Sequence, residues 1–250
     1  GLVGPHRSMS DERRFVVKGV LGQGGFGRVY LADFVSSGGF RKEVALKVLS
    51  DETGAHVESA ARLRDEARLL GLLRHRNIVA VDDLVRLEAG WGVVMEVVAG
   101  VDLRVLMLHL AQQGRPFPPR SAAAVVEGVA RALEAAYDHR PSGGDPLRVI
   151  HRDIKPGNVR ITPEGEVKVL DFGIARAEFQ EREVVTGDAR FGSLAYMSPE
   201  RVLGEAADTP AADIYALGVV LWEMLVLRQR GRARLKPERH ADQVDEMLRE

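Results

Sequence analysis

The feature that most constrains the fold of this chain is a pair of polar segments separated by a short predicted hairpin. Residues 151–158 read HRDIKPGN, and residues 169–173 read VLDFG. Between them, apolar and polar residues alternate over 159–162 and 167–170, and turn residues at 163–165 join the two runs, which predicts two short antiparallel strands. A hairpin of this kind returns the second polar segment to the first, so we expect both to contribute to one site.

The two segments carry side chains suited to a metal–phosphate group. Asn158 and Asp171 offer the oxygen ligands that hard cations such as Mg²⁺ prefer, and Asp153 is a carboxylate able to accept a proton. Lys155 adds a positive charge beside them. The alternative is a solvated polar loop that contains these residues by chance. It is disfavoured because eight residues match in the same order and the DFG triplet follows at the expected sequence spacing.

Composition limits the classes of protein to consider. The 250 residues are 45% hydrophobic and 28% charged, which suits one large globular domain or two small lobes with a buried core. The net charge of −1 gives no electrostatic case for nucleic acid or an anionic membrane. The absence of cysteine excludes disulfides, thiolate metal sites and cysteine nucleophiles.

No segment of the sequence reads as a membrane span or a secretory signal. The longest apolar run, 214–227, is interrupted by Gly218 and Glu223 and is too short to cross a bilayer. We therefore expect a cytoplasmic protein, or the cytoplasmic domain of a longer one.

A glycine-rich stretch near the N-terminus predicts a phosphate-binding hairpin. Residues 15–21 read as a strand, and Gly22, Gly24 and Gly27 match G-x-G-x-x-G, which is a weak signal by itself. A dinucleotide-binding fold needs a helix after the last glycine, whereas β-formers follow here over 28–32. Small residues at a hairpin tip let backbone N–H groups approach phosphate oxygens. An ordinary glycine-rich hairpin remains the alternative for the motif alone.

A lysine in the next predicted strand needs a partner. Lys47 lies among apolar residues of the strand 43–49, where a charged amine is costly unless it is paired. Residues from about 58 to 73 have helical apolar spacing. Glu66 on this predicted helix is the best candidate for the partner, and the adjacent Asp65 is expected to be solvated.

These motifs resemble those of protein kinases, and HRDIKPGN, DFGIAR and DIYALGVVLWEML are most similar to bacterial eukaryotic-like (Hanks-type) Ser/Thr kinases. The resemblance is strong over about 14–227. It implies an α+β, bilobal fold. A disordered segment over 1–12 would precede a five-stranded β lobe with one main helix over 13–97. A larger, mainly helical lobe over 98–250 would follow, and we expect it to be cut short at its C-terminus.

Several further elements are expected from the residues themselves. The runs over 77–81 and 91–98 are expected to be the fourth and fifth strands. Residues 103–112 predict one helix, and Ser121 is expected to cap a long helix that runs to about His139.

The resemblance also implies a reaction, the transfer of the γ-phosphate of ATP to Ser or Thr hydroxyls of a protein substrate. Asp153 would orient and deprotonate the hydroxyl, and Lys155 would neutralise charge on the γ-phosphate. Asn158 and Asp171 would hold Mg²⁺, or Mn²⁺ in its place, and Lys47 would anchor the α- and β-phosphates. The residues assigned to catalysis are Asp153, Lys155, Asn158, Lys47 and Glu66.

A second set of residues is implied to contact the nucleotide. Met95 would line the back of the adenine site, Glu96 and Val98 would hydrogen-bond adenine through their backbone, and Asp102 could reach the ribose. Arg160 stands where a hydrophobic residue usually packs against adenine, although its methylene stem could serve. The full set is Leu21, Gly22, Gly24, Gly27, Val29, Ala45, Lys47, Met95, Glu96, Val98 and Arg160.

The same resemblance suggests regulation. Arg152 beside the catalytic aspartate is typical of kinases that are activated by phosphorylation. We expect that phosphate on Thr186, added in trans by a second copy, whereas Ser193 would be a structural hydroxyl that bridges Asp153 and Lys155. Asp213 would hold the backbone of the HRD segment. Four residues are expected to stack in one apolar column: Leu70, Val81, His151 and Phe172.

Two alternatives to an active Ser/Thr kinase remain. A pseudokinase or nucleotide-binding scaffold is suggested by Arg160 and by the short C-terminal lobe. A small-molecule phosphotransferase with a related fold is disfavoured because such enzymes lack the Ser-Pro-Glu of residues 198–200 and usually carry glycine in place of Arg152. Lys155, two residues after Asp153, is the Ser/Thr form of the loop.

Overall fold

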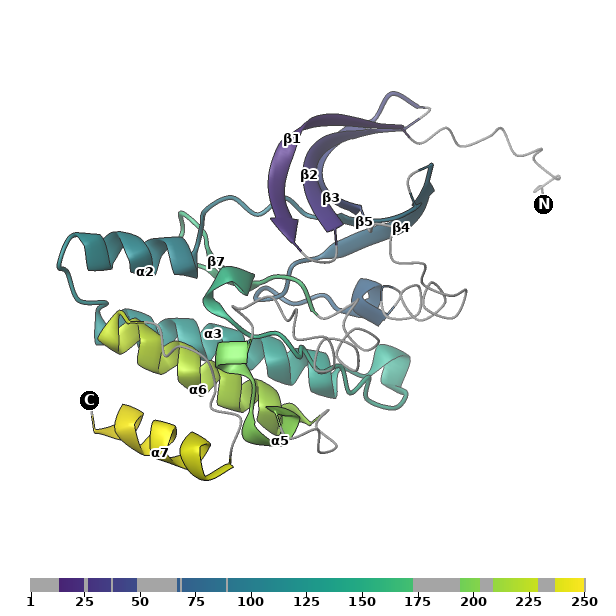
Figure 1. The fold of residues 1–250 in the computed structure, drawn as a ribbon. Helices are drawn as coiled ribbons and strands as arrows, with labels where there is room; N and C mark the ends of the chain where they lie inside the picture. Colours follow the sequence, from purple (N-terminus) through teal and green to yellow (C-terminus); the bar gives the residue numbers. More distant parts are fainter. Residues whose placement is uncertain are drawn as a thin grey trace. The chain divides into compact units, whose positions relative to one another are not determined.

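The computed structural model divides the chain into two compact units (Figure 1). Unit 1 comprises Gly1–Ala55 and Val81–Val97, and unit 2 comprises His56–Ala80 and Val98–Glu250. The residues that the structure describes are 14–24, 27–36, 38–48, 67, 69–88, 90–172, 194–202, 209–228 and 237–249. In this described part, no helix combines the length and the apolarity needed to cross a bilayer.

Unit 1 contains a five-stranded antiparallel sheet with the strand order β1-β2-β3-β5-β4, which confirms the predicted sheet of five strands. The strands are β1 (Arg14–Gly24), β2 (Gly27–Val35), β3 (Arg41–Val48), β4 (Val81–Leu87) and β5 (Gly90–Met95).

The alternation of side chains along β3 separates the two faces of this sheet. Val44 and Leu46 lie on the face that forms an apolar cluster with Ala32 and Val94. Ala45 and Lys47 alternate with these two residues along β3 and therefore project to the opposite face. The sheet thus buries one face in its core and leaves the other face to carry candidate site residues.

The glycine-rich stretch is a hairpin, as predicted. Strands β1 and β2 pair up to Gly24 and Gly27, and β2 continues directly from the last glycine with no helix. The register shifts between Val20 and Gly22, where two steps along β1 match one step along β2. This bulge at Leu21 bends the strand that leads into the tip.

Unit 2 is mainly helical and has a small sheet beside its helices (Figure 1). The three-stranded sheet has the order β6-β7-β8, with the strands β6 (Val101–Asp102), β7 (Val159–Ile161) and β8 (Val167–Val169). The helices are α2 (Leu103–Gln112), α3 (Pro119–Asp138), α5 (Pro199–Val202), α6 (Pro210–Val226) and α7 (Pro237–Leu248).

Helices α3 and α6 pack side by side, and α7 lies along α6 (Figure 1). The indole Nε1 of Trp222 on α6 donates to the carbonyl of Met247 on α7 at 2.9 Å. The predicted cap of the long helix is wrong, because Ser121 lies inside α3. The helix begins two residues earlier at Pro119, whose fixed φ suits the first helical position and needs no backbone N–H there.

The predicted strand over 77–81 is also wrong, because only Val81 belongs to β4. The residues before it pair with β8 instead. Asn77 Nδ2 donates to the Val167 carbonyl at 2.8 Å, and the Asn77 carbonyl accepts the N–H of Val169 at 2.8 Å. The N–H of Val79 then donates to the Val169 carbonyl at 3.0 Å. This segment therefore fixes β8 within unit 2.

Gly128 on α3 permits close packing against β8, and this contact generates a prediction. A Cβ at Gly128 would lie 2.7 Å from the Cβ of Val167, which is buried. We expect Gly128→Ala to destabilise the protein by about 1–3 kcal/mol in urea unfolding. Gly218→Ala on α6 is the matched control, because a Cβ there meets no described heavy atom within 4 Å. The control should raise stability by about 0.5–1 kcal/mol, and equal effects of the two changes would contradict the packing argument.

Candidate active site

The hairpin brings the two polar segments of the sequence together, as predicted. A short 3-10 turn, Pro156–Asn158, runs directly into β7, and β8 runs directly into Leu170 and Asp171. The N–H of Leu170 donates to the carbonyl of Asn158 at 2.8 Å, which joins the end of one segment to the start of the other.

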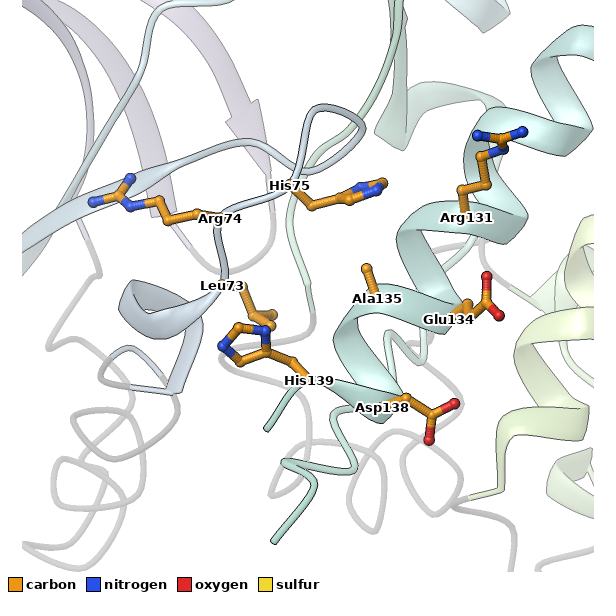
Figure 2. A pocket seen from close by; sticks show the side chains of 8 residues that line it. All are labelled: Leu73, Arg74, His75, Arg131, Glu134, Ala135, Asp138 and His139. Atoms are coloured by element: carbon orange, nitrogen blue, oxygen red, sulfur yellow. The ribbon is translucent and has the colours of Figure 1, made fainter. Parts of the chain in front are cut away.

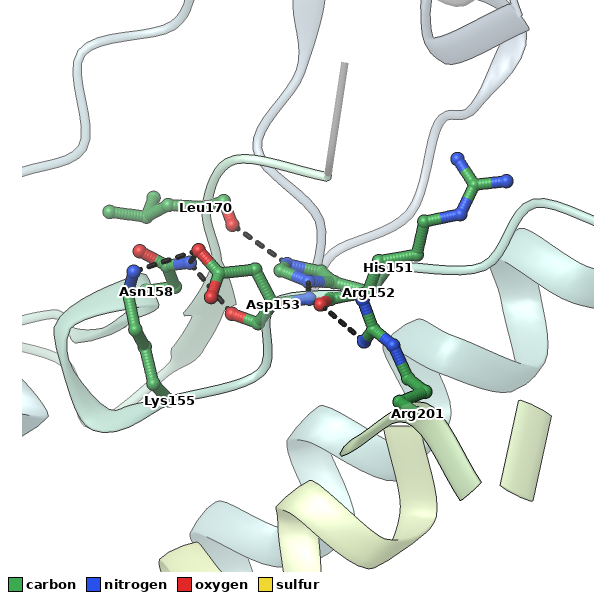
Figure 3. Close-up of polar contacts among 7 residues, drawn as sticks. All are labelled: His151, Arg152, Asp153, Lys155, Asn158, Leu170 and Arg201. Carbon is green, nitrogen blue, oxygen red and sulfur yellow. Dashed lines mark hydrogen bonds and ion pairs between the residues drawn. The ribbon is translucent and has the colours of Figure 1, made fainter. Parts of the chain in front are cut away.

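Asp153 is the centre of a compact polar cluster (Figure 3). Its Oδ2 accepts hydrogen bonds from Lys155 Nζ at 2.7 Å and from Asn158 Nδ2 at 3.1 Å. Asn158 Nδ2 also donates to the Asp153 carbonyl at 2.8 Å. The side chain of Asp153 is 13% exposed and that of Lys155 is 28% exposed. The carboxylate is therefore held in one orientation while it remains accessible to solvent.

His151 bonds to the backbone of this cluster as a neutral imidazole. The side chain is fully buried, and burial lowers its pKa below the usual value of 6.5. Its Nδ1 accepts the N–H of Asp153 at 3.2 Å, so the proton belongs on Nε2, which donates to the Leu170 carbonyl at 2.9 Å. The ring packs against Phe172 with centroids 4.6 Å apart. The side chain of His151 thus links the two polar segments. His151 and Phe172 are two of the four residues of the predicted apolar column.

Asp213 holds the backbone of the HRD segment, as predicted. Its two carboxylate oxygens accept the N–H groups of His151 at 2.7 Å and of Arg152 at 2.8 Å. Asp213 is 3% exposed at the start of α6. Burial raises its pKa, and the two backbone hydrogen bonds and the nearby His151 oppose that shift.

The backbone is in unusual conformations on either side of this cluster. Arg152 has a φ of +66° and Asp171 has a φ of +53°, a region that residues with side chains adopt rarely. The carbonyl of Arg152 accepts a hydrogen bond from Nη1 of Arg201 at 2.8 Å (Figure 3). Sequence analysis missed Arg201, because no motif around it indicates a role. Its partner, Arg152, lies 49 residues earlier in the chain.

The oxygen donors present fit a Mg²⁺ ion that is shared with phosphates. Asn158 uses its Nδ2 to bind Asp153, which leaves Oδ1 as a donor to a cation, and Asp171 follows immediately after β8. No cluster of three or more His, Cys, Asp or Glu residues in the described ranges could hold a metal. Mg²⁺ commonly takes one or two protein ligands and completes its shell with phosphate and water, so this donor set is sufficient.

In unit 1, four of the predicted nucleotide-binding residues share one face of the sheet. Lys47 lies opposite Val29 in the β2–β3 register, and Ala45 lies opposite Met95 in the β3–β5 register. Residues opposite each other in antiparallel strands point to the same side. Glu96 and Val98 follow β5 and are half-buried.

Several predicted residues fall outside the described residues. These are Glu66, Thr186 and Ser193.

The structure contains a hydrogen-bonded pair, a buried glutamate and a half-buried tyrosine, that sequence analysis missed. Glu223 on α6 is 1% exposed, and its Oε2 accepts the phenol O–H of Tyr196 at 2.7 Å. Burial, together with the negative charge of Glu223, raises the pKa of Tyr196. A glutamate inside the apolar run 214–227 was the available signal, because a buried carboxylate requires a partner.

A cavity of about 580 Å³ lies elsewhere in unit 2, between the chain at Leu73–His75 and the second half of α3 (Figure 2). Its walls are polar, and Figure 2 shows His75 directed towards α3. Burial and the charge of Arg131 lower the pKa of His75, whose Nδ1 accepts the N–H of Asn77 at 3.3 Å. None of the predicted site residues lines this cavity, so it is separate from the candidate active site.

The fold agrees with comparisons against known proteins. The family model described as the protein kinase domain matches residues 15–249, so the chain belongs to this family. It is 38% identical over 212 residues to the tyrosine-protein kinase MasK of Myxococcus xanthus, covering 84% of this chain and 32% of that protein. It is 35% identical over 215 residues to the serine/threonine-protein kinase PrkC of Bacillus subtilis, covering 86% and 31%.

Solved structures give the same fold. The crystal structure of the Mycobacterium tuberculosis PknI kinase domain matches with a TM-score of 0.66 and 26% identity, over 95% of this chain and 82% of that chain. The chain spans about a third of the length of the curated relatives above.

The contact of Asp213 with two backbone N–H groups generates a prediction about stability. Asp213→Asn replaces one accepting oxygen with an N–H₂ group, which leaves a buried backbone N–H without an acceptor. We expect a loss of about 1–3 kcal/mol in urea unfolding. Asp138→Asn is the matched control, because Asp138 is 63% exposed and pairs with Arg148 at the surface, where the cost should stay below about 1 kcal/mol. Similar losses in both variants would refute a special role for Asp213.

Proposed function

We propose that this chain is an ATP-dependent protein kinase domain that phosphorylates Ser or Thr hydroxyls. The observation that carries the proposal is the fixed orientation of Asp153, which is hydrogen-bonded to Lys155 and Asn158. His151, on the same segment, binds the carbonyl of Leu170, the residue before Asp171. A proton acceptor, a cation and two oxygen donors for a metal are the groups that phosphoryl transfer requires.

In this mechanism Asp153 orients the substrate hydroxyl and accepts its proton as the oxygen attacks the γ-phosphorus and the bond to the β-phosphate oxygen breaks. Lys155, already within 2.7 Å of Asp153, neutralises charge on the transferring group. Asn158 and Asp171 would hold Mg²⁺, which supplies charge neutralisation of the phosphate oxygens when it is bound. Lys47 would anchor the α- and β-phosphates.

The choice of Ser or Thr over Tyr as acceptor rests on the loop itself. Lys155 follows Asp153 by two residues, the arrangement of Ser/Thr kinases, and it is held against the carboxylate. The named relatives include both a tyrosine-protein kinase and serine/threonine-protein kinases, so phosphoamino-acid analysis of the product is the deciding measurement.

A second candidate function is a nucleotide-binding scaffold without transfer. The observation that favours it is Arg160, a charged residue among the predicted contacts of the nucleotide base, with a side chain that is 29% exposed. Nucleotide-dependent thermal stabilisation without phosphate incorporation would support this function.

The activity itself gives the central prediction. With labelled ATP, Mg²⁺ and a generic protein substrate, Asp153→Asn should lower phosphate incorporation by roughly 10²–10⁴-fold, because the proton acceptor is lost. Nucleotide-dependent thermal stabilisation should persist in the variant. Asp145→Asn, in an exposed loop, is the matched control and should keep full activity. Equal incorporation by the wild type and Asp153→Asn would defeat the enzyme proposal.

Regulation gives a further prediction. We expect Thr186 to receive a phosphate in trans, which Arg152 would then contact. Asp153→Asn protein mixed with the wild type and ATP should gain one phosphate, mapped to Thr186 by peptide mass spectrometry, whereas Asp153→Asn alone should gain none. A phosphate that maps to another residue, or that appears on the variant alone, contradicts the prediction.

A further inference from the structure

An arginine–aspartate pair spans the first two strands of the small sheet in unit 2. Asp102 on β6 lies directly opposite Arg160 on β7 in the antiparallel register. Arg160 Nη1 donates to Asp102 Oδ1 at 3.0 Å, and Nη2 donates to the carbonyl of Gly100 at 2.9 Å. One guanidinium therefore holds both a carboxylate and the backbone that precedes it.

The backbone around this pair leaves little room for rearrangement. Gly100 has a φ of +121°, and a Cβ at this position would lie 2.1 Å from the carbonyl oxygen of Ile161. The start of β6 is thus pressed against β7, which fixes the separation of the two groups that the guanidinium binds. The Nε of Arg160 is buried and has no hydrogen-bond partner. The guanidinium therefore bonds through Nη1 to Asp102 and through Nη2 to Gly100.

A carboxylate held in this way discriminates poorly between sugars by their hydroxyl groups. A carboxylate at a nucleotide site typically binds ribose hydroxyls. Here a hydroxyl must either compete with the charge-assisted bond at Oδ1 of Asp102 or use Oδ2 of a carboxylate whose orientation and charge Arg160 already sets. Arginine–carboxylate bonds are roughly twice as strong as bonds between neutral groups. The sugar therefore gains little from Asp102 while Arg160 occupies it.

We infer that Arg160 is a specificity-determining residue: by occupying Asp102, it prevents that carboxylate from distinguishing ribose from 2′-deoxyribose in the bound nucleoside triphosphate. This inference rests on the proposed function, since it assumes that Asp102 and Arg160 belong to a nucleotide site. Sites that are built to hydrogen-bond a hydroxyl reject analogues that lack it. In this chain the group that would do so is already bonded.

The experiment measures dissociation constants for ATP and for dATP by calorimetry, in the wild type and in variants at the pair. The wild type should bind the two within about twofold of each other. Arg160→Met keeps the apolar stem and frees Asp102, so the preference for ATP should rise to roughly tenfold, the worth of one hydrogen bond to a charged group. Arg160→Lys keeps a cation beside Asp102 and should behave as the wild type.

Two further variants make the assignment specific to the pair. Asp102→Asn alone should leave the dATP-to-ATP ratio near the wild-type value, and the double variant Arg160→Met with Asp102→Asn should lose the gained preference. Arg120→Met, on the exposed surface of α3, is the matched control and should change neither constant.

The possible results separate the inference from the proposal beneath it. Binding of both nucleotides with an unchanged ratio in Arg160→Met overturns the inference and leaves the proposed function standing. A strong ATP preference in the wild type that Asp102→Asn abolishes overturns it as well. If no variant binds either nucleotide while circular dichroism shows folded protein, the proposed function fails, and the inference fails with it.

Discussion

The hydrogen bonds from the N–H groups of His151 and Arg152 to Asp213 fix the candidate active site to the helical core. Asp213 lies on α6, a helix whose core-facing residues are buried. Burying a carboxylate there would cost free energy if it had no hydrogen-bond partners, and the two backbone N–H groups offset this cost. They also hold Arg152 in its unusual positive φ. The position of Asp153, one residue further on, depends on this anchor, because a loop with such a backbone would otherwise relax.

Strand β8 places the second half of the site. It is bonded on one side to β7 and on the other to the segment at Asn77–Val79, so these two segments of unit 2 determine where β8 ends. Leu170 and Asp171 follow at once, and the imidazole of His151 binds the Leu170 carbonyl. Asp153 and Asp171, the proposed proton acceptor and metal ligand, are therefore positioned by connected backbone contacts within one unit.

Local patterns predicted the parts of the structure that local physics decides. The helix at 103–112 and the hairpin around 163–165 follow from periodicity and turn residues, and they were found where expected. The prediction of a strand over 77–81 was wrong because the carbonyl of Asn77 and the N–H of Val79 bond to Val169 of β8, which is remote in the sequence. Glu223 and Arg201 were missed for the same reason, since each acts through a partner remote in the sequence that no local pattern identifies.

The two faces of β7 separate the proposed catalytic groups from the proposed nucleotide contact at Arg160. Val159 is fully buried and lies opposite Val169, so its face of the hairpin belongs to the structure that carries Asn158 and Asp171. Arg160, the next residue, projects to the other face and bonds to β6. Because the side chains of a strand alternate, a change at Arg160 alters what the β6 side of the sheet presents to a ligand without moving the packed side. We therefore expect a change at Arg160 to alter the proposed nucleotide contact without displacing Asn158 and Asp171.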